Sequence, residues 1–343
     1  MSEAHTHEGG HNGHYLLSRY AAALFWLARY MERIENLARI LDVTETFVRT
    51  GGTESGWLSV LQINADVERF MKSHGEVSQQ AVVQFYVLDR DNPTSIAAAM
   101  AAAHENARTL RPLISTEMWT QLNLFHREVR ALTSFDVTPS RMSMLCDLLK
   151  QRCQLHAGIT EGTFFRDQAW HFYAMGRYLE RADQTTRLVD IKYHTLLPSV
   201  HDIGGAMDVS QWHALLRAAA GYHAFRRVYP SGMTPATVAG FLLMNHAFPR
   251  SLILCVERLR QHLMQLRSGY GLRAPVAAEL LDDLSAAILT QGIDEVLARG
   301  LHEFLDWVQL QLIAAHGAIG HAFWRPPPPR QTQTQIQTQL RQN

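Results

Sequence analysis

The chain lacks an excess of charge of either sign: among its 343 residues, 32 lysines and arginines balance 32 aspartates and glutamates. A neutral chain has no strong electrostatic bias toward nucleic acid or an anionic membrane. It also has no run of about 18 apolar residues, and its start, MSEAHTHEGGHNGH, has no apolar signal core. We therefore expect a cytoplasmic protein that binds neither nucleic acid nor a membrane.

Cysteine is scarce, with Cys146, Cys153 and Cys255 alone in the chain. None forms a CxxC pair, and no histidines stand beside them at zinc-finger spacing, so neither a disulfide framework nor a structural zinc site is indicated. A reducing compartment is the simplest interpretation. We interpret Cys146 and Cys153 as core residues on one helical face. His156 follows them closely, but closeness in sequence does not make a Cys–His pair.

The sequence also lacks the short motifs of common enzymes. No GxSxG elbow, Walker loop, HExxH or dinucleotide fingerprint is present. We expect no cofactor and no metal to be bound by this chain. His171 and His194, on either side of the second charged helix described below, are interpreted as structural. The histidines near the start of the chain could bind a metal weakly but are more simply part of a solvated tail: His5, His7, His11 and His14.

Composition divides the chain into a globular part and two tails. Residues 1–13 are polar and rich in glycine and histidine, and residues 326–343 join a proline run to a Gln/Thr tract. Both have little to bury, so both are predicted to be disordered. Residues 14–325 are then the globular domain.

The pattern within this domain is helical nearly throughout. Strong helix formers dominate, and apolar residues recur at steps of three and four, as in Leu27, Tyr30, Ile34, Leu37 and Leu41. The most strand-like piece, VVQFYVL at 82–88, is assigned to a helix because its counterpart, TVAGFLLM, is helical in pattern. The predicted fold class is all-α.

One charged helix occurs twice. LARYMERIENLARILD at 27–42 returns as MGRYLERADQTTRLVD at 175–190, with six identical positions. Further on, FYVLDRDNPTSI at 85–96 matches FLLMNHAFPRSL at 241–252, so that Pro93 aligns with Pro249. The order of segments is the same in both regions. We expect two duplicated halves, about 14–150 and 160–325, packed as a helical bundle about a pseudo-two-fold axis.

The repeated helix carries its charges on one arc, opposite the apolar stripe. In the first copy this arc holds Arg29, Glu32, Arg33 and Asn36. In the second it holds Arg177, Glu180, Arg181 and Gln184. Arg29 and Glu32 are i,i+3 neighbours and are expected to pair along the helix, leaving Arg33 for another helix or an anion. Three interpretations stay open: ion pairs between the two helices, ligand or partner binding, and a solvated surface.

These blocks resemble the alpha-E family, an all-helical family with a Glu-Arg signature. The resemblance rests on LLSRYAAALFWLARYMERIENLARILDV, DRDNPTSI, EMWTQLN, FYAMGRYLERADQTTRLVD and FLLMNHAFPRSL, in that order. It implies Glu32-Arg33 and Glu180-Arg181 as signature positions, called the signature residues below. Secondary candidates implied in the same way are Asp89, Asn92, Pro93, Ser95, Glu117, Trp119 and Asn123.

The resemblance also implies partners. Alpha-E proteins are encoded beside, or fused to, a circularly permuted ATP-grasp protein, and a transglutaminase-like peptidase is a frequent neighbour. ATP and Mg²⁺ would then be bound by the ATP-grasp partner, which joins carboxylates to amines. This chain would be its helical partner subunit, with an Arg/Glu-lined binding or transfer site.

Two alternatives remain beside the partner-subunit hypothesis. One is a stand-alone acyl-transfer enzyme with Glu32 or Glu180 as base. The other is a non-catalytic scaffold or anion-binding module. The candidate substrate-binding residues are Arg29, Arg33, Arg177, Arg181, Asp89 and Asn92.

Overall fold

The computed structural model describes residues 16–49, 55–195 and 206–324, and throughout these ranges every regular element is a helix. The predicted all-α fold class is thereby confirmed. The two predicted tails, and the four N-terminal histidines, lie outside the described residues. In the described ranges no helix combines the length and the apolar content that a membrane span needs.

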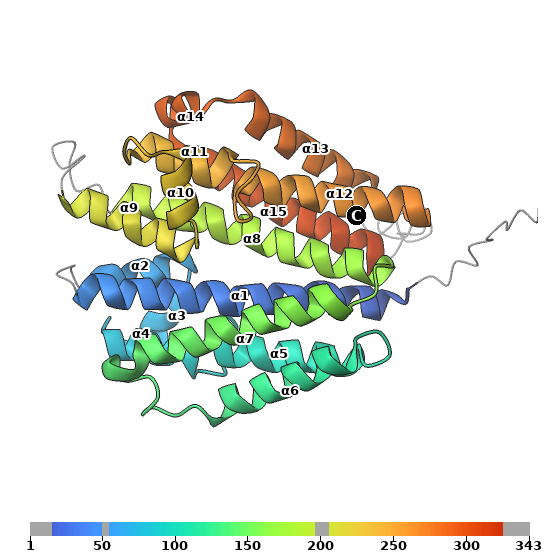
Figure 1. Ribbon diagram of the computed structural model, residues 1–343, viewed down its shortest axis with the longest axis horizontal. Helices are drawn as coiled ribbons and strands as arrows, with labels where there is room; N and C mark the ends of the chain where they lie inside the picture. The colour runs from blue at the N-terminus through green and yellow to red at the C-terminus, as the bar shows by residue number, and fades with distance from the viewer. Residues whose placement is uncertain (1–15, 50–54, 196–205, 325–343) are drawn as a thin grey trace, which may run out of the picture.

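The first seven helices form the lower half of the molecule in Figure 1. They are α1 (Ser18–Arg49), α2 (Ser55–Ile63), α3 (Val67–His74), α4 (Gln79–Val87), α5 (Ile96–Thr109), α6 (Thr116–Ala131) and α7 (Met142–Thr163), with a 3₁₀ turn at Pro139–Arg141. The segment 82–88, strand-like in sequence, forms most of α4, so its assignment to a helix is confirmed.

The remaining helices form the upper half. They are α8 (Gln168–Thr195), α9 (Ala206–Ala218), α10 (Tyr222–Val228), α11 (Pro235–Met244), α12 (Leu252–Tyr270), α13 (Pro275–Thr290), α14 (Ile293–Arg299) and α15 (Leu301–Phe323). The two long helices α1 and α8 lie side by side along the middle of the bundle (Figure 1).

The two halves surround their central helices in the same way. Helix α1 contacts α5 and α7, and α5 contacts α6; in the other half α8 contacts α12 and α15, and α12 contacts α13. This agreement is what a duplicated chain requires, and the duplication itself stays a prediction.

Hydroxyl caps start the helices at corresponding places. Ser95 accepts a hydrogen bond from the Ala98 amide at the start of α5, and Ser251 accepts one from the Leu254 amide at the start of α12. These are the two Pro-x-Ser segments of the repeat. Each cap fixes the loop before it, and the loop before α12 carries a residue of the candidate site.

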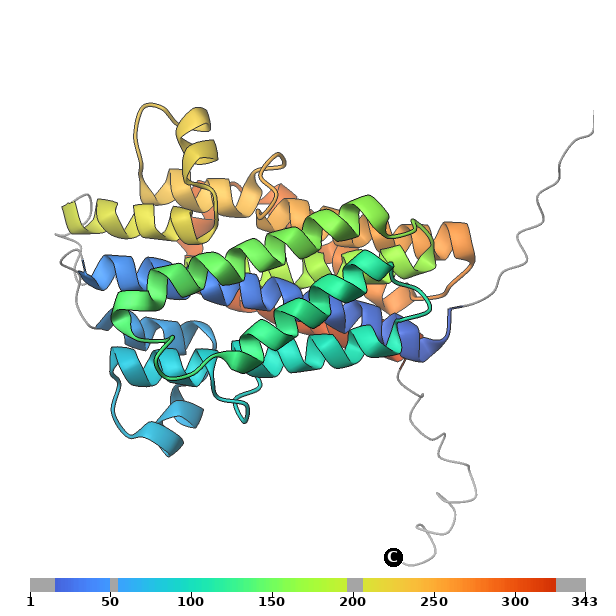
Figure 2. The ribbon, with the colours of Figure 1, turned by 60° about the horizontal axis from the view of Figure 1, so that its bottom comes forward.

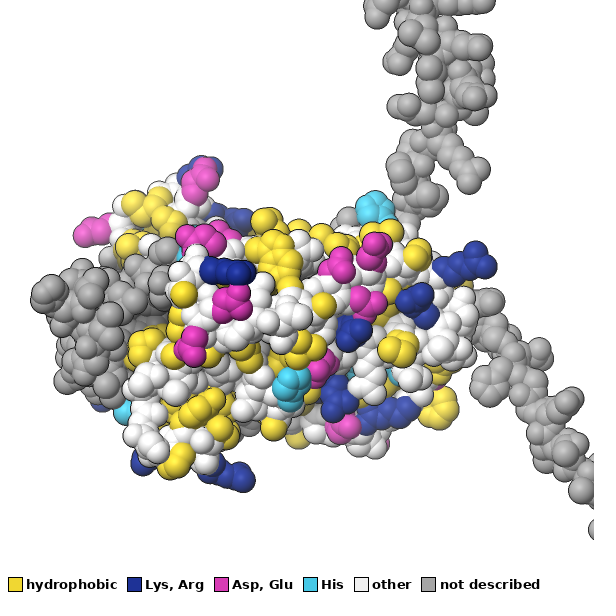
Figure 3. All heavy atoms as spheres, turned by 90° about the horizontal axis from the view of Figure 1, so that it is seen from above, with side chains coloured by type: hydrophobic (Ala, Val, Ile, Leu, Met, Phe, Trp, Pro, Cys, Tyr) yellow, Lys and Arg dark blue, Asp and Glu magenta, His cyan; other side chains and the backbone are white. Residues whose placement is uncertain are grey.

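The surface over α11 to α14 shows no patch of a single charge. Figure 3 shows basic and acidic side chains interspersed over this face. That distribution matches the neutral total charge of the chain.

Candidate functional site

The candidate site forms beside a close contact between α1 and α8. A Cβ atom at Gly176 would lie 2.1 Å from the backbone oxygen of Phe25, so only glycine fits there. The adjacent residue of α1, Leu24, is completely buried, as is Phe25. This contact brings the next turns of both helices, which carry the signature residues, against each other.

Glu180 of α8 is held by two arginines of α1. Its carboxylate accepts hydrogen bonds from Arg29 Nε at 2.7 Å, from Arg33 Nε at 2.7 Å and from Arg33 Nη2 at 3.1 Å. The Glu180 side chain is 0% exposed. Arg33 therefore forms the two-bonded fork that a lysine cannot form.

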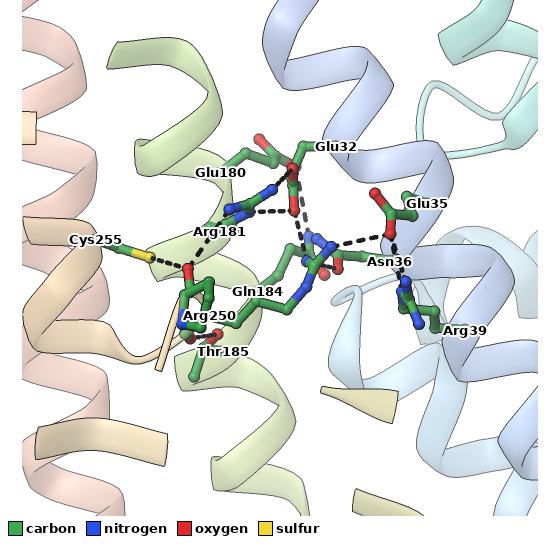
Figure 4. A network of polar contacts seen from close by, with 11 residues as sticks. Glu32, Glu35, Asn36, Arg39, Glu180, Arg181, Gln184, Thr185, Arg250 and Cys255 are labelled. Carbon is green, nitrogen blue, oxygen red and sulfur yellow. Dashed lines mark hydrogen bonds and ion pairs between the residues drawn. The ribbon is translucent and has the colours of Figure 1, made fainter. Parts of the chain in front are cut away.

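Glu32 of α1 makes the reciprocal contacts. Arg181 Nε and Nη2 donate to its two oxygens at 2.8 and 3.0 Å. Arg250 Nη1 donates to Glu32 at 2.5 Å and to Asn36 Oδ1 at 2.7 Å, and Arg250 Nη2 lies 3.1 Å from Glu35 (Figure 4). We call the six residues of these crossed pairs the Glu–Arg cluster: Arg29, Glu32, Arg33, Glu180, Arg181 and Arg250.

One sequence expectation about this helix is wrong. The expected pair between Arg29 and Glu32 along α1 does not form, because each residue is taken by a partner across the interface. The charged arc is buried, since Arg29, Glu32 and Glu180 lie between the helices. A buried carboxylate needs the closest and best-directed cations available, and the facing helix supplies these. Of the three interpretations, the geometry is that of ion pairs between helices.

Arg250 was not among the predicted site residues. It stands before the Ser251 cap, where the first half has Thr94 before Ser95. Its backbone oxygen accepts a hydrogen bond from Thr185 Oγ1 of α8 at 2.8 Å, which fixes the loop against that helix. No local sequence pattern marks Arg250 as a site residue, because its partner Glu32 lies 218 residues away.

The electrostatics of the Glu–Arg cluster favour ionised carboxylates. Burial by itself raises the pKa of Glu32, but the guanidiniums of Arg181 and Arg250 outweigh it and lower that pKa to about 2. For Glu180, burial is likewise outweighed by Arg33 and Arg29, and its pKa also falls to about 2. Both carboxylates are consequently very weak bases at neutral pH.

Arg177 differs from the other three predicted arginines. Its counterpart Arg29 binds Glu180, whereas among the described residues no carboxylate forms an ion pair with Arg177. Its guanidinium lies 5.6 to 5.8 Å from the ring centres of Trp170, Tyr173 and Tyr178. Its Nε is buried without a hydrogen-bond partner. Arg177 is therefore the predicted arginine whose donors are least used within the fold.

Beyond the cluster, ion pairs recur along both helices. Glu35 binds Arg39 at 2.6 Å on α1, and Asp183 binds Arg187 at 2.9 Å at the equivalent place on α8. Gln184, the last residue of the second predicted arc, reaches Glu180 at 3.5 Å. These contacts extend the polar interface along both helices.

The structure places Asp89 and Asn92 in the loop between α4 and α5, and within the described ranges neither forms a hydrogen bond or ion pair with the Glu–Arg cluster. Asp89 Oδ1 accepts from the Asp91 amide, and buried Asn92 donates to the Phe85 oxygen and accepts from the Thr94 amide. Ser95 caps α5 and also donates to the backbone oxygen of Asp89. Pro93, the remaining candidate here, is exposed. In this loop the candidates serve as turn and cap residues.

The candidates of α6 form a separate group. Glu117 is exposed, Trp119 stacks on His104 with ring centres 5.4 Å apart, and Asn123 Oδ1 lies 2.7 Å from His104 Nε2. The structure therefore divides the predicted residues into three places and brings only the repeated Glu and Arg residues together.

The cysteines and histidines have packing roles. Cys146 and Cys153 are buried free thiols, as expected for core residues, and Cys255 is a third buried free thiol. His156 lies 3.1 Å from both Gln121 Oε1 and Tyr173 Oη, and burial lowers its pKa to about 3. His171 Nδ1 lies 3.0 Å from His262 Nδ1. The side chain of His194 is outside the described residues.

A metal site needs at least three converging ligands. Within the described ranges, one group meets that condition: Asp190, His302 and Asp306, whose ligand atoms lie within 4.8 Å of one another. His302 Nδ1 is 2.7 Å from Asp190, and this hydrogen bond raises the pKa of His302. The pair already acts as a histidine–carboxylate contact between α15 and α8.

Comparisons with known proteins agree with this geometry. Residues 16–324 match the model of the alpha-E family, described as a predicted alpha-helical domain with a conserved ER motif. Uncharacterized proteins of Mycobacterium bovis and Mycobacterium tuberculosis are each 25% identical to this chain over 309 residues, which covers 82% of this chain.

The chain spans about a third of these relatives, since the match covers 34% of their length. No solved structure matches it. The two Glu-Arg pairs that cross between α1 and α8 are formed by the ER dipeptides of the repeated helix, Glu32-Arg33 and Glu180-Arg181. With its helical fold and its match over nearly the whole described chain, the protein belongs to the alpha-E family.

Proposed function

We propose that this chain is the non-ATP-binding helical subunit of an ATP-grasp-associated system that forms peptide or amide bonds. Its task is to present a binding surface to the ATP-grasp enzyme and to the acyl or amine substrate. The Glu–Arg cluster has a structural role in this subunit, because its charges are paired with one another and hold α1 against α8.

The observation that carries this proposal is the pairing of both signature carboxylates. A general base works best when its pKa is near the working pH, but the pKa of Glu32 and of Glu180 is about 2. Each is also enclosed by two guanidiniums and shielded from substrate. The stand-alone acyl-transfer alternative, with one of these residues as base, is disfavoured for both reasons.

Two observations support an ATP-grasp partner: the resemblance to the alpha-E family and the greater length of the mycobacterial relatives. The resemblance to the alpha-E family implies a protein that is encoded beside an ATP-grasp protein or fused to it. The related mycobacterial proteins are about three times longer than the region they share with this chain, which leaves room for further domains.

Arg177 is the residue of the cluster region that suits a substrate carboxylate. Its Nε is buried without a partner, and its guanidinium is flanked by aromatic rings that orient it. A guanidinium with open donors binds a carboxylate through two parallel hydrogen bonds.

The test is to mix the purified chain with the ATP-grasp protein encoded beside it. Sedimentation velocity should show a complex, and amine-dependent ATP turnover should rise when this chain is added. The Arg177→Gln variant should keep the complex and lose the stimulation. Tight ATP binding by this chain alone, or a mixture that neither associates nor changes in turnover, would refute the proposal.

A further inference from the structure

A small cavity of about 220 Å³ lies where the loop after α4 meets the end of α6. Helices α5 and α6 are antiparallel, so the start of α5 and the end of α6 lie at the same end of this pair (Figure 2). The cavity is lined by Arg90 from the loop, Ala97 and Ala101 from α5, and His126 and Arg130 from α6, together with apolar side chains.

The lining contains three basic side chains and no acidic one. Among the described residues, neither Arg90 nor Arg130 has an ion pair or a side-chain hydrogen bond. Asp89 and Asp91 flank Arg90 in the sequence, but within the described ranges neither forms an ion pair with it. Glu128, two residues before Arg130, is held by Arg152 through contacts of 2.5 and 2.7 Å. The hydrogen-bond donors of these two guanidinium groups, Arg90 and Arg130, are therefore available to a ligand in the cavity.

His126 is held in place by its neighbour. Its ring stacks on His104 with ring centres 4.1 Å apart, and His104 Nε2 is anchored 2.7 Å from Asn123 Oδ1. Burial, then His104, Arg130 and Arg90, lower the pKa of His126. The two arginines place positive potential at this ring, and no carboxylate lines the cavity.

The other half of the molecule offers a comparison at matching positions. With Pro93 aligned to Pro249, Arg90 matches His246 and Ala101 matches Glu257. His246 Nδ1 lies 3.2 Å from Glu257 Oε2, so the second half carries its own anion for the loop cation. In the first half alanine replaces that carboxylate, which leaves Arg90 unpaired beside an open cavity.

We propose that this cavity binds a phosphoryl group, presented as free phosphate or as a small phosphate ester. Two guanidiniums and an imidazole approach from a loop and a helix, which suits an anion with three oxygens better than a planar carboxylate. The start of α5, a helix of 14 residues, adds the partial positive charge of its first amides.

The experiment follows the His126 imidazole signals of the full chain by NMR during titration with inorganic phosphate at constant ionic strength. Phosphate should produce a saturable shift and raise the pKa of His126. Arg90→Gln and Arg130→Gln should each weaken binding at least about tenfold, since each removes a charge-assisted pair. Arg127→Gln, an exposed arginine on the same helix outside the cavity lining, should change it less than about twofold.

A second variant introduces into the first half a pair like that of His246 with Glu257 in the second half. Ala101 is exposed, so Ala101→Glu should fold normally, pair with Arg90 and abolish phosphate binding. A phosphate ester that competes with inorganic phosphate at the same signals supports an ester as the natural ligand. The proposal is overturned if no saturable shift appears up to about 10 mM phosphate. It is also overturned if acetate binds as well as phosphate, or if Arg127→Gln weakens binding as much as the cavity variants do.

Discussion

Glu32 and Glu180 are each enclosed by guanidinium groups from the opposite helix or from the loop before α12. Taking a carboxylate out of water costs several kcal/mol, and the attraction of the paired arginines offsets that cost only while every partner is present. The cluster therefore specifies one arrangement of α1 and α8 rather than adding a large net stability.

Removing one charge of the cluster should be strongly destabilising. We expect Glu180→Gln to lower the free energy of unfolding by about 3 to 5 kcal/mol, because Arg29 and Arg33 are left buried without a counter-charge. Urea unfolding followed by circular dichroism measures this change.

The matched control for that substitution is Glu68→Gln. Glu68 also faces a cation, Lys72 at 2.7 Å, but its side chain is 84% exposed. It should change the unfolding free energy by no more than experimental error. Equal effects of the two substitutions would mean that the cluster is solvated.

The free energy of unfolding at acidic pH should also depend on the Glu–Arg cluster. Folding lowers the pKa of Glu32 and Glu180 from 4.5 to about 2, so the unfolded chain binds protons that the folded chain refuses. Their contribution is complete above pH 4.5 and is lost as the pH falls toward 2. Denaturant unfolding between pH 6 and pH 2 should show this loss, and a double variant with Glu32→Gln and Glu180→Gln should show a flatter profile in the same window.

At this scale the sequence predicted the right residue types but not their partners. Six identities between the repeated helices indicated that Glu32, Arg33, Glu180 and Arg181 serve a specific role. Spacing alone favoured the i,i+3 pair of Arg29 with Glu32, because local geometry is all that spacing contains. In the folded protein both residues are buried against the facing helix and pair with its side chains. Which helix faces α1 cannot be read from the spacing of residues within α1.

At the scale of helices, the contact of α1 with α8 depends on Gly176. A methyl group there would overlap the Phe25 oxygen, since its Cβ would lie 2.1 Å away. We expect Gly176→Ala to destabilise the fold by at least about 1 to 3 kcal/mol, the usual effect of overpacking, although alanine is the better helix former.

Helix α7 supplies a control for that substitution. Gly158 lies in the middle of α7 with nothing within 4 Å of its would-be Cβ. Gly158→Ala should therefore stabilise the protein by about 0.4 to 1 kcal/mol. Thermal melts of both variants measure the difference in sign. A neutral or stabilising Gly176→Ala would show that the two backbones are not in contact.

The helices themselves followed from the sequence, because periodic apolar residues and Ser or Pro at helix starts are local signals. Segment 82–88 is an example: its residues favour strands, but the Ser78 cap and burial of Val82, Val83 and Phe85 on a helix decide its state. The position of the loop before α12 was not predictable. Arg250 reaches Glu32 across a separation of 218 residues, which no local pattern records.

At the scale of the whole molecule, the cluster couples the first seven helices to the last eight. If this coupling is strong, both halves unfold in one transition. Hydrogen exchange should find α5 and α12, the inner helices beside α1 and α8, opening with the same free energy. In the double variant with Glu32→Gln and Glu180→Gln their protection should diverge. Divergence already in the wild-type chain would show that the halves are independent.

The central claim is that the signature residues pair between α1 and α8. Double-mutant cycles by urea unfolding test it most directly, with Arg33→Gln and Glu180→Gln as the crossed pair and Arg29→Gln and Glu32→Gln as the pair along α1. The account predicts a coupling free energy of about 1 to 3 kcal/mol for Arg33 with Glu180. It predicts a smaller coupling for Arg29 with Glu32, which do not bond to each other. No coupling between Arg33 and Glu180, or a larger one within α1, would contradict it.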